Sequence, residues 1–144
     1  MLSAAPTNAN IALLQKTRAF FLPNGLLSQA ARTNQNEFAF ETRPQQTEMA
    51  EAVAAALLQQ EHLTIEAGTG VGKTLAYLIP LLLFARARKQ PVAVSTQTIT
   101  LQEQIMAKDI PLLQHCMDFD FKVVLCKGRA NYICRRRLEQ ARNS

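Results

Sequence analysis

The sequence is poor in the features that mark several classes of protein. It has no tryptophan, and its 144 residues include only five glycines and three cysteines. The odd number and irregular spacing of Cys116, Cys126 and Cys134 argue against a disulfide-stabilised secreted scaffold and suit a reducing compartment. The longest apolar run, residues 75–85, contains Pro80 and is much shorter than the roughly 20 residues that cross a bilayer. With no secretory leader either, we expect a cytoplasmic protein without a membrane partner.

Acidic residues are scarce toward the C-terminus, while the whole chain carries a net charge of +5. Between residues 122 and 142, seven cations stand against one acid, Glu139. Such a cluster attracts polyanions by releasing condensed counterions, which makes nucleic acid a natural partner. A solvated basic helix face would have the same composition, and charge alone does not separate the two.

The chain divides near residue 43 into a lead-in and one domain. Residues 1–42 hold scattered apolar pairs and a Pro-Asn-Gly turn, which predicts a loosely structured lead-in with one or two short helices. From residue 43 to 144, helical apolar periodicity alternates with short β-leaning runs. Helices are predicted over residues 45–60, 72–89 (kinked or interrupted at Pro80) and 99–108, and strands over 62–66, 91–95 and 121–125. The alternation predicts an α/β fold, a parallel sheet flanked by helices.

A glycine-rich loop carries the clearest chemistry in the sequence. Three of the five glycines fall in EAGTGVGKT, residues 66–74. Alternating glycines let the backbone curl around an anion, and the helix that follows adds the positive end of its dipole. The spacing is that of a P-loop (Walker A), with Ala67 where the first glycine usually stands. The predicted phosphate-binding residues are Ala67, Gly68, Thr69, Gly70, Val71, Gly72, Lys73 and Thr74.

Two side chains of this loop have separate predicted roles. Lys73 supplies a positive charge to the β- and γ-phosphates of ATP, and the Thr74 hydroxyl binds Mg²⁺. An ordinary glycine turn is the alternative, but the motif stands between a predicted strand and a predicted helix, as a P-loop requires.

The residues around the loop resemble a known family. The run EAGTGVGKTLAYLIPLL resembles motif I of superfamily 2 DNA helicases, in particular the XPD-like, iron–sulfur group of the DinG and YoaA type. RPQQTEMAEAV (43–53) resembles the Q-motif region of that group, STQTITLQEQIMAKDIPLL (95–113) its motif Ia, and CKGRANYICRRRLEQ (126–140) its cluster-binding segment. The resemblance covers about 100 residues in order, and implies a RecA-like first motor lobe.

The resemblance implies roles for individual residues. Arg43 and Gln46 would contact the nucleotide, with Gln46 recognising adenine, although Gln46 could be an ordinary polar residue of a helix's first turn. Cys134 would be the first ligand of a [4Fe–4S] cluster in the full-length protein. Contacts to single-stranded DNA are expected from Thr96, Thr98, Gln102, Lys127, Arg129, Arg135, Arg136 and Arg137. The threonines and Gln102 could instead be helix caps and solvated polar residues.

The chain also departs from the family. None of its eleven acidic residues is adjacent to another, so a DEAH-type motif is absent, and only one cysteine matches a cluster ligand. We therefore expect a truncated first lobe of an ATP-dependent helicase, 5′ to 3′ and active in DNA repair by resemblance, that binds nucleotide without turnover. The alternative is a stand-alone, non-catalytic module that binds nucleotide or nucleic acid. The sequence does not indicate an oligomeric state.

Overall fold

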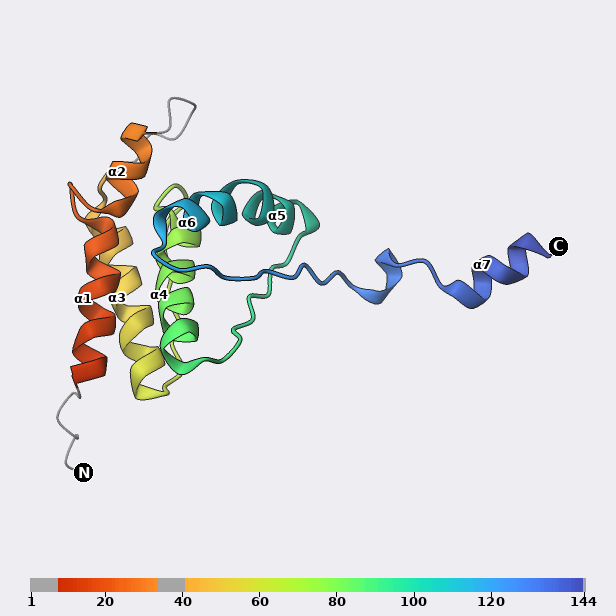
Figure 1. Ribbon diagram of the computed structural model, residues 1–144, viewed down its shortest axis with the longest axis horizontal. Coiled ribbons are helices and arrows are strands. Elements are labelled where there is room, and N and C mark those ends of the chain that lie inside the picture. The colour runs from red at the N-terminus through yellow and green to blue at the C-terminus, as the bar shows by residue number, and fades with distance from the viewer. Residues whose placement is uncertain (1–7, 34–40, 144) are drawn as a thin grey trace.

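The computed structural model describes residues 8–33 and 41–143, and all regular secondary structure in those ranges is helical. The elements are α1 (Asn8–Phe21), α2 (Leu26–Thr33), α3 (Pro44–Gln59), α4 (Lys73–Arg88), α5 (Ile99–Gln104), the π-helix η1 (Ile105–Asp109), α6 (Ile110–Cys116), the 3₁₀-helix η2 (Arg129–Asn131) and α7 (Arg135–Arg142). Helices α1, α3 and α4 lie side by side, α5 and α6 lie at one end of α4, and the C-terminal segment leaves this body (Figure 1).

The predicted α/β fold with a parallel sheet is wrong for the described residues, because they contain no strand. The three predicted strands, 62–66, 91–95 and 121–125, are segments without regular secondary structure, and no backbone hydrogen bond is found between them. A strand is stable only when a neighbour satisfies its N–H and C=O groups. Their apolar side chains stay exposed instead, as Leu63, Val94 and Val124 do at 45%, 40% and 82%.

The pair α3 and α4 forms the centre of the helical body. Pro44 stands in the first turn of α3, where its missing N–H costs nothing. Three small side chains, Ala50 and Ala54 on α3 and Ala76 on α4, are completely buried, which lets the two helices approach closely. Pro80 lies inside α4 without interrupting it, and its ring is fully buried.

The N-terminal helices pack on this pair. The turn between α1 and α2 closes through a hydrogen bond from the Gly25 N–H to the Leu22 carbonyl, 2.8 Å long. A side chain at residue 25 would collide with backbone carbonyls, so the turn requires glycine. Phe21 and Leu27, at 1% and 0% exposure, join the core. The predicted division at residue 42 stays a prediction, and residues 34–40 lie outside the described residues.

The C-terminal segment contributes little to the core. Helix α7 buries none of its residues, and Ile133 just before it is 79% exposed. Across residues 8–33 and 41–143, no helix has the length and apolar character to span a bilayer.

Removing core volume from α4 tests this packing. Ile79 is fully buried, so Ile79→Ala should lower the free energy of unfolding by about 2–5 kcal/mol through lost burial and a residual cavity. Ile11→Ala on α1, where Ile11 is 40% exposed, serves as the matched control and should cost well under half as much. Urea denaturation followed by circular dichroism measures both, and equal losses would contradict the described core.

The buried acid Asp109 predicts a pH dependence of stability. Burial raises the pKa of Asp109, and Lys108 opposes this shift. The folded state therefore binds the proton more tightly than the unfolded state, and stability falls as pH rises from the unfolded pKa through the higher folded pKa. Asp109→Asn should remove this contribution, so the variant gains stability relative to wild type as pH rises through that window. Denaturation at a series of acidic to neutral pH values checks this, and a difference that is constant with pH would contradict it.

Candidate functional site

The glycine loop ends where α4 begins, at Lys73. Gly70 and Gly72 both have φ of +82°, in the left-handed region that a side chain disfavours. A Cβ at residue 72 would also collide with the Gln46 side chain, whereas a Cβ at residue 68 would meet nothing within 4 Å. The glycines at 70 and 72 are thus required by the backbone conformation, and they turn the chain into the first turn of α4.

The Lys73 side chain folds back over the loop. Its Nζ donates to the carbonyl oxygen of Ala67 at 3.0 Å and to that of Gly68 at 2.8 Å. The ammonium group is therefore held against the residues predicted to bind phosphate. These bonds are exposed, so an anion in the loop can compete for the same donors.

Both predicted nucleotide contacts from the start of α3 reach the loop. The Gln46 Nε2 donates to the Gly72 carbonyl at 2.9 Å, and the Arg43 guanidinium donates to the Gly70 carbonyl. Arg43 also pairs with Glu41 at 3.0 Å. Gln46 is only 4% exposed, and its amide donor is used on the loop backbone. Gln46 thus links α3 to the loop through a buried side-chain hydrogen bond. Its recognition of adenine stays a prediction.

A cavity of about 360 Å³ lies between α3 and the loop, next to Gly68 and Val71. Gln45, Glu48 and Met49 of α3 line it. None of these three residues was predicted from the sequence to belong to the site. Their spacing of three and four along a helix that precedes the loop is the signal that points to one shared face.

The predicted magnesium ligand Thr74 has a neighbour one turn further along α4. Burial raises the pKa of Tyr77, a side-chain hydrogen bond from Thr74 opposes that shift, and the negative charge of Asp109 adds to it. Asp109 belongs to η1, so this cluster joins α4 to another helical element.

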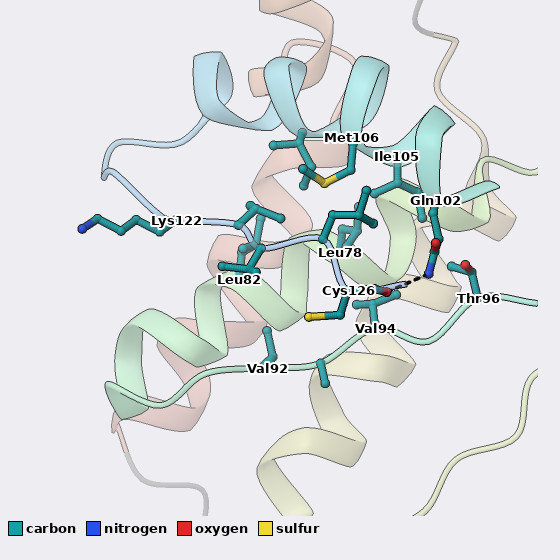
Figure 2. Close-up of a pocket in the computed structure, with 15 residues that line it drawn as sticks. Leu78, Leu82, Val92, Val94, Thr96, Gln102, Ile105, Met106, Lys122 and Cys126 are labelled. Carbon is teal, nitrogen blue, oxygen red and sulfur yellow. Dashed lines mark hydrogen bonds between the residues drawn. The ribbon is translucent and has the colours of Figure 1, made fainter. Parts of the chain in front are cut away.

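The predicted DNA contacts near α5 make internal hydrogen bonds. The Thr98 Oγ1 accepts from the Leu101 N–H at 3.2 Å and caps α5, and the Thr96 Oγ1 donates to the Thr98 carbonyl at 3.3 Å. Gln102 points at residue 126, where its Nε2 donates to the Cys126 carbonyl at 3.4 Å (Figure 2). Thr98 therefore caps α5, as the capping alternative expects, whereas Thr96 and Gln102 donate to backbone carbonyls. DNA contact by the three side chains stays a prediction.

Thr96 and Gln102 lie at the edge of an apolar groove of about 320 Å³ (Figure 2). Its walls come from Leu78 and Leu82 of α4, from η1, and from residues 92–94 and 122–126. Residues 92–94 and 122–126 overlap two of the predicted strands. They line the groove and make no backbone hydrogen bonds with each other.

The basic residues of the C-terminal segment are spread over separate elements. Lys127 pairs with Glu103 of α5 at 3.4 Å, and Arg129 begins η2. Arg135, Arg136 and Arg137 form the first turn of α7, a turn without an acid, and within the described ranges none of the three has an ion pair. Cations at the positive end of a helix repel its dipole, so this turn has a strong positive potential that a phosphate would relieve.

The cysteines do not form a metal site in this chain. Cys116 is buried in the core, where burial raises the pKa of its thiol, while Cys126 and Cys134 are exposed. Among the described residues no three or more His, Cys, Asp or Glu side chains cluster as metal ligands. A [4Fe–4S] cluster takes four ligands, so the three cysteines here do not hold one.

Comparison with known proteins matches this chain to helicases. Residues 44–142 match the DEAD/DEAH box helicase family. Over 120 residues the chain is 43% identical to the ATP-dependent DNA helicase YoaA of Haemophilus influenzae, covering 83% of this chain and 17% of that protein. It is 46% identical over 101 residues to the ATP-dependent DNA helicase DinG of Escherichia coli (69% and 14%), and 43% identical over 101 residues to the 3′-5′ exonuclease DinG of Bacillus subtilis (70% and 11%). No solved structure matches significantly.

The matched region contains the glycine loop, Gln46 of α3, which donates to it, α5 and the basic C-terminal segment. The chain spans less than a fifth of the length of these curated relatives. The resemblance to DinG and YoaA helicases that the motifs indicated is confirmed. The chain belongs to the DEAD/DEAH box helicase family.

Proposed function

We propose that this chain is the ATP-binding part of an ATP-dependent DNA helicase. The observation that carries the proposal is the loop of residues 67–72, which has two left-handed glycines, meets the N-terminus of α4 and is covered by the Lys73 ammonium. Such a loop presents backbone N–H groups and a helix dipole to phosphate. Family membership supports ATP as the nucleotide, because two of the relatives described above are named ATP-dependent DNA helicases.

The side chains around the loop fit a magnesium–nucleotide complex. Lys73 would exchange the Ala67 and Gly68 carbonyls for phosphate oxygens, which form stronger, charge-assisted hydrogen bonds. Thr74 would bind Mg²⁺, which supplies charge neutralisation of the phosphates. Arg43 and Gln46 would hold the loop in its nucleotide-binding shape from the start of α3.

We propose that the chain by itself binds nucleotide without hydrolysing it. Hydrolysis needs a carboxylate to orient the attacking water and an arginine to stabilise the transition state, and the arginine alone contributes about 10³–10⁵ in rate. No two acidic residues are adjacent in these 144 residues, so a DEAH-type pair is missing. The same observation favours a second candidate, a non-catalytic module that binds nucleotide or nucleic acid independently.

The role of Lys73 can be tested by nucleotide binding. Lys73→Ala should weaken binding of ADP in the presence of Mg²⁺ by at least about tenfold, because each charge-assisted hydrogen bond contributes roughly 1.5–3 kcal/mol. Lys16→Ala on α1 removes the same charge from an exposed position away from the loop and should leave the affinity unchanged. Isothermal titration calorimetry measures the affinities for ADP. A separate assay with ATP should find phosphate release at background for all three proteins. Equal affinity of Lys73→Ala and wild type would refute the assignment.

We also propose that the helicase acts on single-stranded DNA through two parts of this chain. The first is the surface around α5, with Thr96, Thr98 and Gln102, and the second is the basic C-terminal segment that includes Lys127 and Arg129. The exposed first turn of α7 supports the second part, since its arginines have no protein anion beside them in the described ranges. The Gln102–Cys126 hydrogen bond and the Glu103–Lys127 pair join the two parts.

The arginines of α7 can be tested by a salt titration. Affinity for a single-stranded oligonucleotide should fall as salt rises, with a log–log slope of about −0.7 for each phosphate neutralised. Replacing Arg135, Arg136 and Arg137 by alanine should flatten that slope by up to about two units.

The matched control removes three cations elsewhere, in Lys16→Ala/Arg18→Ala/Arg32→Ala on α1 and α2, and should flatten the slope much less. Circular dichroism first establishes that both variants are folded. Equal slopes for the two triple variants would mean that net charge, and not the α7 turn, drives binding. DNA binding that does not respond to Mg-ADP would favour the non-catalytic module.

The remaining expectations rest on family resemblance. Cys134 would ligate an iron–sulfur cluster only together with three further cysteines from outside these 144 residues. A 5′ to 3′ direction, a role in DNA repair and a cytoplasmic location are proposed on the same basis.

A further inference from the structure

Tyr132 is an aromatic residue that the core does not use. It is 57% exposed, whereas every other Phe and Tyr within residues 8–33 and 41–143 is buried or half-buried. It follows η2 directly, in the segment that carries the proposed DNA-binding cations. Tyrosine is enriched at binding interfaces because its ring offers a flat apolar surface. The exposed ring is therefore a candidate contact for a partner.

Hydrogen bonds hold this ring in one place. The Tyr132 Oη accepts from the Lys127 N–H at 2.8 Å, and the Tyr132 N–H donates to the Arg129 carbonyl at 3.2 Å. The backbone N–H and the side-chain amide of Asn131 both donate to the Gly128 carbonyl, at 2.9 and 3.2 Å. These bonds close the segment into a loop. A ring that is already fixed before its partner arrives loses less conformational entropy on binding.

The loop is also attached to α5. The Lys127 Nζ pairs with the Glu103 carboxylate at 3.4 Å, and the Gln102 Nε2 donates to the Cys126 carbonyl at 3.4 Å. The ring therefore belongs to a loop that begins at the α5 surface proposed to contact DNA. Beyond this attachment the chain leaves the helical body (Figure 1), so a long, flexible partner can reach the ring from solvent.

A cavity of about 850 Å³ lies beside the ring. Its lining residues include no acid, and they combine the Tyr132 ring with three arginines, Arg129, Arg136 and Arg137. Within the described ranges none of these arginines has an ion pair. A flat aromatic surface next to unpaired cations matches a nucleotide unit, in which a flat base is joined to an anionic phosphate.

We propose that Tyr132 stacks on an unpaired base of single-stranded DNA, while the neighbouring arginines bind the flanking phosphates. The inference rests on the proposed DNA-binding function, and it adds a contact to bases that cations bound to phosphate do not supply. Every base has a π-face, so this contact tolerates any sequence. In a duplex the faces are covered by neighbouring base pairs, so the contact favours single strands.

The test compares two oligonucleotides of equal length and charge, a deoxythymidine strand and an abasic strand that has the same backbone without bases. Wild type should bind the thymidine strand at least about fivefold more tightly, because stacking one base on an aromatic side chain has an effect of that size or larger. Tyr132→Ala should lose most of this preference and bind the abasic strand as wild type does. Its salt slope should be unchanged, because the substitution removes no charge.

Two variants control for other effects of the substitution. Tyr132→Phe keeps the ring and removes the oxygen that accepts from Lys127, so its affinity for the thymidine strand should stay within about threefold of wild type. Leu22→Ala removes an apolar side chain that is 47% exposed next to α1 and should change neither affinity nor preference. Circular dichroism first establishes that each variant is folded.

A second measurement does not depend on affinity. The sequence has no tryptophan, so Tyr132→Trp introduces a single indole whose fluorescence reports on this position alone. At saturating concentrations, the thymidine strand should quench this fluorescence through stacking, and the abasic strand should quench it much less.

The outcomes separate this inference from the proposed DNA binding. If Tyr132→Ala weakens binding of both strands equally, or if Tyr132→Phe loses as much as Tyr132→Ala, the residue only shapes the loop and the inference is wrong. Equal binding of both strands by wild type, with a salt slope that depends on the α7 arginines, would also overturn it while leaving the DNA-binding proposal intact. If folded wild-type protein binds neither strand, both proposals fail.

Discussion

The close packing of α3 against α4 is the constraint on which the rest of this structure depends. The Ala50, Ala54 and Ala76 side chains are fully buried, and their small size lets α3 and α4 pack closely and holds the ends of the two helices near each other. This close packing lets Gln46 reach the Gly72 carbonyl from the start of α3. The glycine loop is therefore positioned by helix packing as much as by its own sequence, and a change in the α3–α4 contact would move the loop.

Hydrogen bonding in the loop explains how a segment without regular secondary structure keeps its shape. Its carbonyl oxygens accept from Lys73, Arg43 and Gln46, so cationic and amide donors surround the backbone at residues 67–72. Of these donors, Gln46 is buried and Lys73 is exposed. The buried Gln46 hydrogen bond stabilises the fold, whereas the exposed Lys73 ammonium can exchange its hydrogen-bond partners at little cost in free energy. In the proposed function, stability and ligand response therefore depend on different side chains around the same loop.

The absence of a sheet among the described residues shows that a local preference for β structure does not ensure strand pairing. Residues 91–95 and 121–125 have the β-branched and apolar side chains of strands, yet both segments lack regular secondary structure. Together with α4 and η1 they line an apolar groove, and Val94 and Val124 stay exposed. A strand's backbone groups need a partner that is distant in sequence, and local composition does not specify whether one is present.

The sequence by itself determined the features that depend on neighbouring residues. The left-handed glycines of the loop, the helices α3 and α4, and the family of the chain all follow from steric limits on φ, from helical periodicity and from motif spacing. Only the tertiary structure decided that Gln46 is buried against Gly72. It also decided that, within residues 8–33 and 41–143, one Asp109 oxygen has no hydrogen-bond partner and the β-leaning segments do not pair. These features depend on which groups meet across the fold, and the free energy of such contacts is set by burial and partner geometry that local sequence does not encode.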